Sequence, residues 1–292
     1  AVFGLALAGE AAARALTGRG LEVVLSDDAI VDEHRRLASE LGCAIVPVAT
    51  DSDIATFLDG VDVLIPAPGV APHHRVIVEA LVRNVSVRTE SDIAYEREQQ
   101  KKEGTRPILG VTGTDGKTTT TMIAAALLRG GGRTVGEVGN TDLPFMAAID
   151  QPFDAFVVEC SSFRLQFTDA FRCDASVWLN LAPDHLDWHG SMEKYAGAKR
   201  RLWAHSRPSD VVIAPTNNEM ILDTARATNS RCVTFGLDAG DYTVSSGSLI
   251  SPHGVICSVD ELWRALPHDI TNSLAAAALV IESGLSGVGD VA

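Results

Sequence analysis

Residues Gly110-Val-Thr-Gly-Thr-Asp-Gly-Lys-Thr-Thr-Thr-Thr121 continue an apolar segment that begins at Pro107 and lead into a pattern typical of a helix. Glycines between a strand and a helix let backbone N–H groups converge, and the N-terminus of the helix adds partial positive charge. The pattern therefore predicts a phosphate-binding loop in which Lys117 reaches the β- and γ-phosphates and Thr118 binds Mg²⁺. Its register is unusual, because Val111 stands where the common P-loop has its first glycine. An ordinary glycine-rich turn is the alternative, and Gly-Lys-Thr-Thr at the start of a helix favours the phosphate site.

The segments on both sides of this loop alternate between β-rich runs and helical patterns, as a parallel α/β sheet does. Before the loop, the patterns predict strands at 1–5, 22–26, 44–48, 62–66 and 85–89, and helices at 10–16, 31–41 and 73–82. From the loop onward, they predict strands at 108–111, near 135, and at 155–159, 175–181, 211–214, 232–235, 242–244, 249–250 and 255–257. The helices expected there are 117–128, 191–205, 218–228 and 270–282. The sequence thus predicts an α/β fold throughout.

A chain of 292 residues is expected to fold as two domains, because single hydrophobic cores stop growing near roughly 250 residues. The polar stretch Glu96–Thr105 is typical of an exposed helix end followed by a linker. We therefore expect one domain at 1–93 and a second at 94–292. The chain begins inside a predicted strand, and Gly284–Ala292 contains no predicted helix or strand, so a fragment of a longer protein is expected.

The net charge of −14 argues against a general affinity for nucleic acid or for anionic membranes, which would be repelled over most of the surface. The five cysteines are scattered and form no C-x-x-C pair, so reduced thiols in a cytosolic protein are expected rather than disulfides or a zinc site. The longest apolar run, Leu274–Ile281, is too short to cross a bilayer, and no signal peptide opens the chain. These features indicate a soluble, cytoplasmic protein.

The apolar strand within Phe153–Leu165 ends on a carboxylate, Glu159, at the edge of the sheet where ligands bind in parallel α/β folds. Such a carboxylate can hold a metal ion, although a solvated glutamate is the more common interpretation of an isolated one. Ser161 and Ser162 follow, but the G-x-S-x-G pattern of a nucleophile is absent.

The segment Ala175–Gly190 is a predicted buried strand followed by a loop that contains His185 and His189. Their spacing is that of a zinc helix, but Leu186 stands where the general-base glutamate belongs. His185 is therefore either a hydrogen-bonding residue or, next to a nucleotide site, a metal ligand. The following helical pattern carries Lys199, which by itself would be interpreted as a surface lysine.

At the N-terminus, Phe3–Gly9 is similar to the G-x-G-x-x-G dinucleotide fingerprint, but Ala6 replaces the middle glycine, and its β-carbon hinders approach to a pyrophosphate. Asp27 and Asp28 end the next predicted strand, where a ribose-binding acid would stand. A dinucleotide site, a site for another nucleotide and a structural turn all stay open.

These motifs occur together in an order and spacing that resemble the Mur ligases, the ATP-dependent amide ligases of peptidoglycan synthesis. The resemblance covers essentially the whole chain and rests on six segments, namely Gly110–Thr121, Gly139–Pro144, Glu159–Leu165, Asn180–Asp187, Ala196–Lys199 and His268–Asn272. It implies an N-terminal Rossmann-like domain with a parallel sheet, which binds the UDP of a sugar nucleotide, and a central P-loop-type α/β ATPase domain. The resemblance covers only these two domains, and we expect the family's C-terminal Rossmann-like domain to be absent from this sequence.

The resemblance also implies roles for individual residues. ATP would be bound by Gly113, Thr114, Asp115, Gly116, Lys117, Thr118, Thr119 and Asn272. Two Mg²⁺ ions would be held by Thr118, Glu159, His185 and Lys199. The sugar nucleotide would be bound by Leu7, Ala8, Asp27, Asn140, Ser161 and His185. The expected catalytic residues are Lys117, His185 and Lys199, and the family carbamoylates the lysine that matches Lys199, which turns a cation into an anionic metal ligand.

The motif E-x-S-S-F-x-L and the segment Pro68–Val70 are most similar to the family members that use UDP-N-acetylmuramoyl-L-alanine and D-glutamate. The resemblance implies that the carboxylate of the sugar nucleotide attacks the γ-phosphate of ATP, and that the amine of D-glutamate displaces the resulting acyl phosphate. A monomer without nucleic-acid or membrane partners is expected.

The sequence departs from the family pattern at three positions. Asp269 replaces an amide that contacts adenine, and a carboxylate cannot donate a hydrogen bond to the base. Ala6 and Ala8 replace a glycine and a hydroxyl residue of the sugar-nucleotide site. Three alternatives stay open, namely another Mur-type or folylpolyglutamate-type ligase, a nicotinamide-dependent oxidoreductase that rests on Gly4–Gly9 alone, and a nucleotide-binding module without catalysis.

Overall fold

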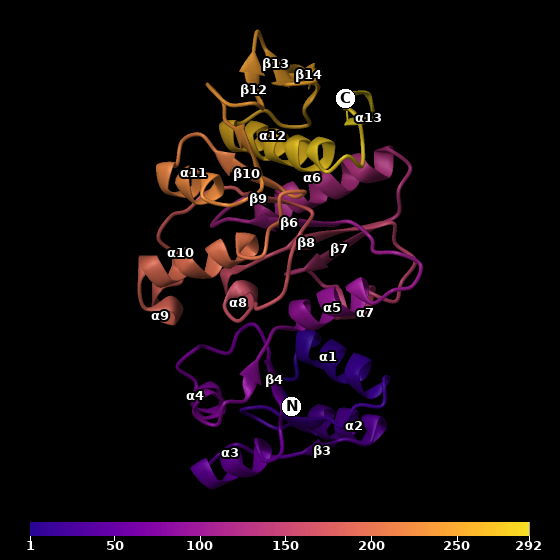
Figure 1. The fold of residues 1–292 in the computed structure, drawn as a ribbon, viewed down its shortest axis with the longest axis vertical. Helices are drawn as coiled ribbons and strands as arrows, with labels where there is room; N and C mark the ends of the chain where they lie inside the picture. The colour runs from indigo at the N-terminus through magenta and orange to yellow at the C-terminus, as the bar shows by residue number, and fades with distance from the viewer. Residues whose placement is uncertain (292) are drawn as a thin grey trace. The chain divides into compact units, whose positions relative to one another are not determined.

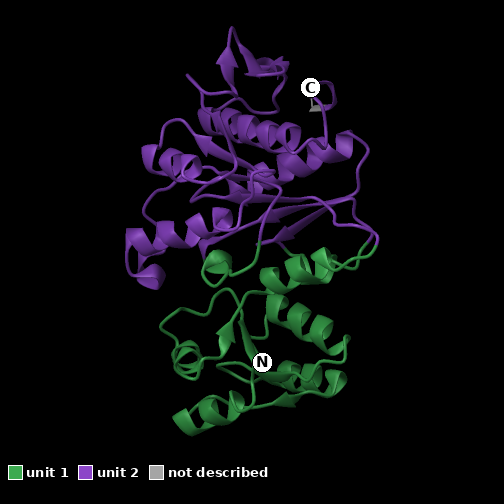
Figure 2. Cartoon of the chain, in the orientation of Figure 1, with its two compact units in different colours: residues 1–102, 142–151, 163–171 green, residues 103–141, 152–162, 172–292 purple. Residues whose placement is uncertain are grey.

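The computed structural model describes residues 1–291, which fold into two compact units (Figure 2). Unit 1 contains residues 1–102 together with two later segments, 142–151 and 163–171, and unit 2 contains the rest of the chain. The predicted α/β class is confirmed, because each unit is built on a parallel sheet. The functional division between residues 1–93 and 94–292 stays a prediction.

Unit 1 is built on a parallel sheet with the strand order β3-β2-β1-β4-β5. Its strands are β1 (Val2–Phe3), β2 (Val24–Ser26), β3 (Ala44–Ile45), β4 (Val63–Pro66) and β5 (Ser86–Val87). The chain runs outward from β1 to β3 and then crosses to β4, so the strand order reverses between β1 and β4. In doubly wound sheets, ligands bind at the carboxyl ends of the strands at such a point.

The helices of unit 1 are α1 (Leu7–Thr17), α2 (Asp32–Leu41), α3 (Asp51–Phe57), α4 (Arg75–Val82), α5 (Glu90–Gln99) and α7 (Phe145–Ala148). The sequence pattern predicts no helix at α3, because its buried residues are too few to reveal a period. A capping box starts this helix, since the side chains of Thr50 and Asp53 each bond the other's backbone N–H. Ile54 and Phe57 then pack into the core of the unit.

Helix α5 buries charged side chains, so the prediction of an exposed helix end at Glu96–Thr105 is wrong for Glu98. The Glu98 side chain is fully buried and pairs with Lys101 at 3.4 Å. Asp92 is buried as well, and its Oδ1 accepts backbone N–H groups from Asp169, Ala170 and Phe171. A buried carboxylate is tolerated when donors or a cation surround it, and charge alone therefore does not mark the end of a helix.

The main sheet of unit 2 is parallel and has the strand order β11-β10-β9-β6-β8-β7. Its strands are β6 (Ile108–Thr112), β7 (Val135–Gly139), β8 (Ala155–Glu159), β9 (Ala175–Trp178), β10 (Val211–Pro215) and β11 (Arg231–Phe235). A small antiparallel sheet contains β12 (Thr243–Ser245), β13 (Ser248–Ser251) and β14 (Gly254–Ser258). After β8 the chain crosses to the other side of β6, so the switch point of the sheet lies directly before the predicted phosphate loop.

The longer helices of unit 2 are α6 (Lys117–Gly130), α10 (Met192–Arg200), α11 (Glu219–Arg226) and α12 (Pro267–Glu282). Helices α6 and α12 lie side by side and share one apolar core with the strands (Figure 1). The short elements of unit 2 are α9 (Leu186–His189), η1 (Arg201–Trp203), η2 (Val259–Glu261) and α13 (Val288–Val291), while α8 (Ser162–Leu165) belongs to unit 1 from residue 163 onward. Two predictions are therefore corrected, because the helix expected at 191–205 ends at residue 200 before η1, and the last segment contains α13.

All five cysteines lie within the described residues and are free thiols, as the sequence predicts. Cys173 packs against Gly110 in β6, where an added β-carbon would lie 2.6 Å from its Sγ. No helix within residues 1–291 combines the length and the apolar character that a membrane crossing needs.

Candidate active site

The predicted phosphate loop follows β6 and ends at Gly116, which has a φ of 81° and stands directly before α6. This backbone conformation favours glycine, and a β-carbon here would also lie 2.5 Å from Oδ1 of Asn272. The carboxamide of Asn180 braces the loop, because its Oδ1 accepts the N–H groups of Thr114 and Asp115 at 3.0 and 2.9 Å. The loop and the N-terminus of α6 are therefore fixed by the protein itself.

Two lysine side chains converge on the carbonyl oxygen of Gly113. Nζ of Lys117 lies 3.0 Å from this oxygen and 2.7 Å from the carbonyl oxygen of Thr114. Nζ of Lys199, which comes from α10, lies 2.6 Å from the same Gly113 oxygen. Lys199 is only 1% exposed and lies over the ring of Tyr195, 4.5 Å from its centre. A surface lysine, the interpretation of Lys199 by itself, is therefore wrong, and two amino groups meet at one position where an anion would be stabilised.

Burial lowers the pKa of both lysines. The pKa of Lys199 falls to about 7, through burial first and the Lys117 cation second, while Asp184 and Asp115 oppose the shift. For Lys117, burial again dominates in lowering the pKa, and Glu159 is the strongest opposing charge. A lysine with a pKa near 7 is partly neutral at physiological pH, so Lys199 can present a free amine as well as an ammonium.

Glu159 ends β8, and its side chain is 1% exposed. Its Oε1 accepts a hydrogen bond from Nδ2 of Asn140 at 3.1 Å. Within residues 1–291 its other oxygen, Oε2, has no hydrogen-bond partner although it is buried. Such an atom is costly to leave uncompensated, and a hard cation such as Mg²⁺ would satisfy it. Ser161, which is also buried, follows two residues later.

The two histidines of the loop after β9 differ in their surroundings. His185 is exposed, has a φ of 51°, and its Nε2 lies 3.2 Å from Oδ2 of Asp184. His189 is buried, and its Nε2 lies 3.0 Å from Oγ of Ser162. Burial is the first cause that lowers the pKa of His189, to about 4, followed by the charges of His185 and Lys199. His189 is therefore a neutral hydrogen-bonding residue near pH 7, whereas His185 is accessible to a ligand.

In the part of the chain that the structure describes, no three His, Cys, Asp or Glu side chains lie close enough together to hold a metal ion by themselves. The predicted metal ligands do not require such a cluster, because Thr118 and Lys199 are of other residue types. Thr118 is exposed in the first turn of α6. The donor set that fits a cation best is thus the buried Glu159 carboxylate, and the roles of the other ligands stay predictions.

The predicted sugar-nucleotide residues Leu7 and Ala8 begin α1 in unit 1, and Asp27 directly follows β2. Gly4 has a φ of 86°, and the N–H of Leu5 donates to Oδ2 of Asp27 at 2.8 Å, so this carboxylate braces the turn. Leu7 is exposed, while Ala8 is buried in the first turn of α1. Ala8 can therefore offer a ligand its backbone N–H but little of its side chain.

No role for Asn180 or Tyr195 follows from the sequence pattern, yet both shape the phosphate loop. The hydroxyl of Tyr195 lies 3.1 Å from Oγ1 of Thr114, and its ring faces Lys199. Asn180 comes two residues after β9, and Glu159 is the last residue of β8, so a polar residue at the carboxyl end of a strand is a signal that could have identified Asn180. Tyr195 precedes Lys199 by four residues on the same helix face, but the sequence does not reveal which loop that face meets.

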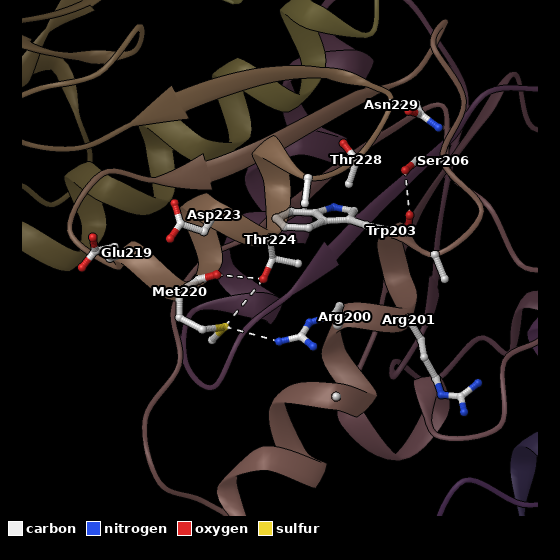
Figure 3. A pocket seen from close by; sticks show the side chains of 13 residues that line it. Arg200, Arg201, Trp203, Ser206, Glu219, Met220, Asp223, Thr224, Thr228 and Asn229 are labelled. Atoms are coloured by element: carbon white, nitrogen blue, oxygen red, sulfur yellow. Dashed lines mark hydrogen bonds between the residues drawn. The ribbon is translucent and has the colours of Figure 1, made fainter.

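A groove of about 1130 Å³ lies between α10, η1 and α11 (Figure 3). It is lined by Arg200 from α10 and by Glu219 and Asp223 from α11. Figure 3 shows the guanidinium of Arg200 directed toward Sδ of Met220, at 4.0 Å. Of the described residues that line the groove, none is a predicted site residue. Helix α10 therefore presents Lys199 to the phosphate loop and Arg200 to a separate groove.

A glycine-containing loop between the central strand of a parallel sheet and a helix, with two lysines on one of its carbonyl groups, defines an α/β protein of the P-loop type. Residues 111–280 match the model of the Mur ligase middle domain. The chain belongs to the Mur ligase family, and the predicted resemblance is confirmed.

Named relatives agree with the predicted member of the family. The chain is 35% identical over 301 residues to UDP-N-acetylmuramoylalanine–D-glutamate ligase of Frankia casuarinae. This alignment covers 97% of the chain and 61% of the relative. The chain is 31% identical over 290 residues to the ligase of the same name from Streptococcus pyogenes, with 98% and 63% covered. The chain thus spans about three fifths of the length of these curated relatives.

Solved structures show the same fold. The UDP-N-acetylmuramate:L-alanyl-gamma-D-glutamyl-meso-diaminopimelate ligase from Neisseria meningitides matches with a TM-score of 0.61 and 16% identity over 97% of this chain and 93% of that one. A murein peptide ligase from Psychrobacter arcticus matches with a TM-score of 0.57 and 18% identity over 98% of this chain and 65% of that one. At these identities the likeness concerns the fold alone.

Proposed function

We propose that the protein to which this chain belongs is a cytoplasmic ATP-dependent ligase that adds D-glutamate to UDP-N-acetylmuramoyl-L-alanine in peptidoglycan precursor synthesis. The observation that carries the proposal is the convergence of Lys117 and Lys199 on the carbonyl oxygen of Gly113, at the N-terminus of α6. The names of the curated relatives support the choice of substrates.

The proposed reaction begins with an anion attacking an anion. A carboxylate oxygen of the sugar nucleotide attacks the γ-phosphorus of ATP, the bond from this phosphorus to the β,γ-bridging oxygen breaks, and ADP leaves. Phosphoryl transfer depends chiefly on positioning and charge stabilisation. The backbone of Gly113–Gly116 and the N-terminus of α6 would orient the phosphates, and Lys117 would stabilise the negative charge that builds up between them.

The second step forms the amide. The amine of D-glutamate attacks the acyl carbon, the tetrahedral intermediate expels inorganic phosphate, and the nitrogen loses its extra proton. Asn140, Ser161 and His185 would orient the sugar-nucleotide carboxyl end, while Leu7, Ala8 and Asp27 would bind its UDP portion. Because the Ala8 side chain is buried, we assign it a backbone contact only.

Magnesium would be held by Thr118, Glu159, His185 and carbamoylated Lys199, and when bound it would neutralise phosphate charge. The buried Oε2 of Glu159, without a hydrogen-bond partner among residues 1–291, supports a cation there. The lowered pKa of Lys199, about 7, supports its carbamoylation, because the free amine attacks CO₂, a nitrogen–carbon bond forms and a proton leaves to solvent. The ammonium of Lys199 would otherwise repel a cation.

The test is phosphate release from ATP by the full-length protein. We expect release that requires UDP-N-acetylmuramoyl-L-alanine and rises to steady turnover only when D-glutamate is added. L-Glutamate, L-alanine and meso-diaminopimelate serve as acceptor controls and distinguish this ligase from the other amide ligases of its family. Steady turnover with one of those acceptors in place of D-glutamate, or phosphate release that does not require the sugar nucleotide, would contradict the proposal.

A further inference from the structure

Arg264, in the loop before α12, forms an ion pair with Asp269, a position where the sequence departs from its family. Nε and Nη2 of Arg264 donate to the two carboxylate oxygens of Asp269 at 2.6 and 2.7 Å. Asp269 is 7% exposed, and the hydrogen bonds from Arg264 are the first cause that lowers its pKa. The carboxylate is therefore charged and held in one orientation. Two parallel bonds of this kind fix both side chains.

Asp269 of this pair lies one helical turn from Asn272, whose side chain lies beside the phosphate loop. The side chain of Asn272 reaches Gly116, because the position of a β-carbon on that glycine would lie 2.5 Å from Oδ1 of Asn272. Asp269 precedes Asn272 by three residues in α12 and so shares its helix face, nearer the N-terminus of the helix. A nucleotide whose phosphates occupy the loop carries its base away from them, and Asp269 lies one helical turn beyond the residue that contacts the loop.

An exposed aromatic ring accompanies the pair. Trp263 is 94% exposed, and the guanidinium carbon of Arg264 lies 5.6 Å from the centre of its ring. An isolated indole is rarely left so fully in water, and bases stack readily on such rings. Within residues 1–291 the Arg264 guanidinium forms no hydrogen bonds beyond the two to Asp269, so Nη1 keeps its donors for a ligand.

We propose that Arg264 and Asp269 together recognise the amino edge of the adenine base of ATP, with Trp263 as its stacking surface. The inference rests on the proposed function. Adenine presents an amino donor beside a ring-nitrogen acceptor, and a carboxamide matches both with its oxygen and its nitrogen. Asp269 supplies only the acceptor, and Arg264 supplies the missing donor. The loss of the adenine contact expected from Asp269 alone is thereby compensated from another position of the chain.

The pair also predicts discrimination against guanine. Guanine presents two acceptors, O6 and N7, along the same edge. Its O6 would meet the carboxylate of Asp269 where adenine offers a donor, and two acceptors repel each other. ATP is therefore expected to bind at least about tenfold more tightly than GTP, the factor that one such mismatch typically produces.

The experiment measures binding of ATP and GTP to the full-length protein by calorimetry for four variants. Arg264→Leu removes the donor and is expected to weaken ATP binding about tenfold. Arg264→Leu with Asp269→Asn restores a carboxamide and is expected to return the Kd for ATP to within about threefold of the wild type. Asp269→Asn alone releases the guanidinium, which donates well to guanine, so the ATP preference over GTP is expected to fall. Trp263→Ala is expected to weaken ATP and GTP by a similar factor, because stacking does not distinguish the bases.

The matched control is Arg226→Leu, an exposed arginine that pairs with Asp223 at 3.8 Å and is expected to leave both affinities unchanged. Thermal unfolding of each variant checks that it is folded. If Arg264→Leu unfolds, Trp263→Ala still tests the site, because the exposed Trp263 side chain contributes little to stability. A double variant that binds ATP no better than Arg264→Leu, or an unchanged ATP-to-GTP ratio in all variants, overturns the inference. A wild type that binds ATP selectively but never turns over with D-glutamate overturns the proposed function instead.

Discussion

The two glycine turns of this chain, after β1 and after β6, have similar backbones and opposite chemical surroundings. Gly4 and Gly116 both adopt positive φ, 86° and 81°, between a strand and a helix. In unit 1 a carboxylate braces the turn, because Asp27 accepts the N–H of Leu5. In unit 2 a neutral amide braces the loop, and the amino groups of two lysines point at it.

The comparison separates what glycine provides from what charge provides. Glycine permits the sharp turn in both units, so the turn by itself does not indicate a phosphate site. The phosphate preference that we propose for unit 2 would come from Lys117 in the loop's own helix and from Lys199, which lies far along the chain on α10. The turn of unit 1, with an acid beside it, suits a hydroxyl or amide group of a ligand better than a phosphate.

The largest expected effect concerns Lys117. Lys117→Ala in the full-length protein is expected to lower ATP-dependent phosphate release on the order of 10³-fold, because a charge that stabilises the transferred phosphoryl group is lost. The measurement is initial rate at saturating sugar nucleotide and D-glutamate. Lys194→Ala, an exposed lysine of α10, is the matched control and should retain turnover. Near-normal turnover of the Lys117 variant would show that the loop takes no part in phosphoryl transfer.

The second effect is the pH dependence of stability that buried Lys199 imposes. Its pKa is about 7 in the folded protein and 10.5 when exposed, so between these values unfolding takes up a proton and the wild type gains stability as the pH rises. Below pH 7 the full penalty for burying the charge is present. Lys199→Met removes it, so the variant's advantage is expected to be greatest near pH 6 and to shrink above pH 7, by up to about 1.4 kcal/mol per pH unit.

Urea unfolding of both proteins from pH 6 to pH 8.5, in buffers free of CO₂, measures this difference. Lys194→Met provides the control, since an exposed lysine should give a difference that is constant with pH. A constant difference for Lys199→Met as well would show that Lys199 is not desolvated in the folded protein.

The third effect tests the loop backbone. Gly116→Ala is expected to cost about 2 kcal/mol of stability, from a strained positive φ and from the contact with Asn272, and to weaken ATP binding. Gly132→Ala has a similar φ of 82° with open space around the added β-carbon, so it should show the backbone strain of about 1 kcal/mol without loss of ATP affinity. Equal ATP affinities for the Gly116 and Gly132 variants would show that the loop does not bind the nucleotide.

The smallest effect concerns the turn of unit 1. Asp27→Ala removes the acceptor for Leu5 N–H and is expected to lower the free energy of unfolding by about 1 kcal/mol. ATP affinity is expected to stay unchanged, while the affinity for the sugar nucleotide falls. Calorimetry with ATP and with the sugar nucleotide measures the two affinities separately. A loss of ATP binding in the Asp27 variant would show that the two turns do not bind different ligands.

Much of the fold could be predicted from the sequence where patterns are long or punctuated by glycine. The strands around Gly110 and Glu159 were predictable because they are continuous apolar runs that end on polar residues. Helix α3 was missed because its signal is a local capping box rather than a period. The charge of Glu98 does not mark the surface, because the partly buried Lys101 pairs with it.

Some residues of the candidate site could likewise be predicted from the sequence, and others could not. Gly113–Thr118 form a local motif, and local motifs follow from neighbouring residues. Asn180 and Tyr195 contribute through contacts that join distant segments, and nothing near them in sequence identifies those partners.

The sequence by itself determined most of the strands and longer helices, the glycine loop and the family, because these depend on period, spacing and backbone freedom, which are properties of neighbouring residues. Only the tertiary structure decided that Lys199 is buried beside Lys117 and that Oε2 of Glu159 has no partner among residues 1–291. The physical reason is that desolvation and pairing depend on which atoms surround a group, and the sheet brings those atoms together from segments far apart in the chain.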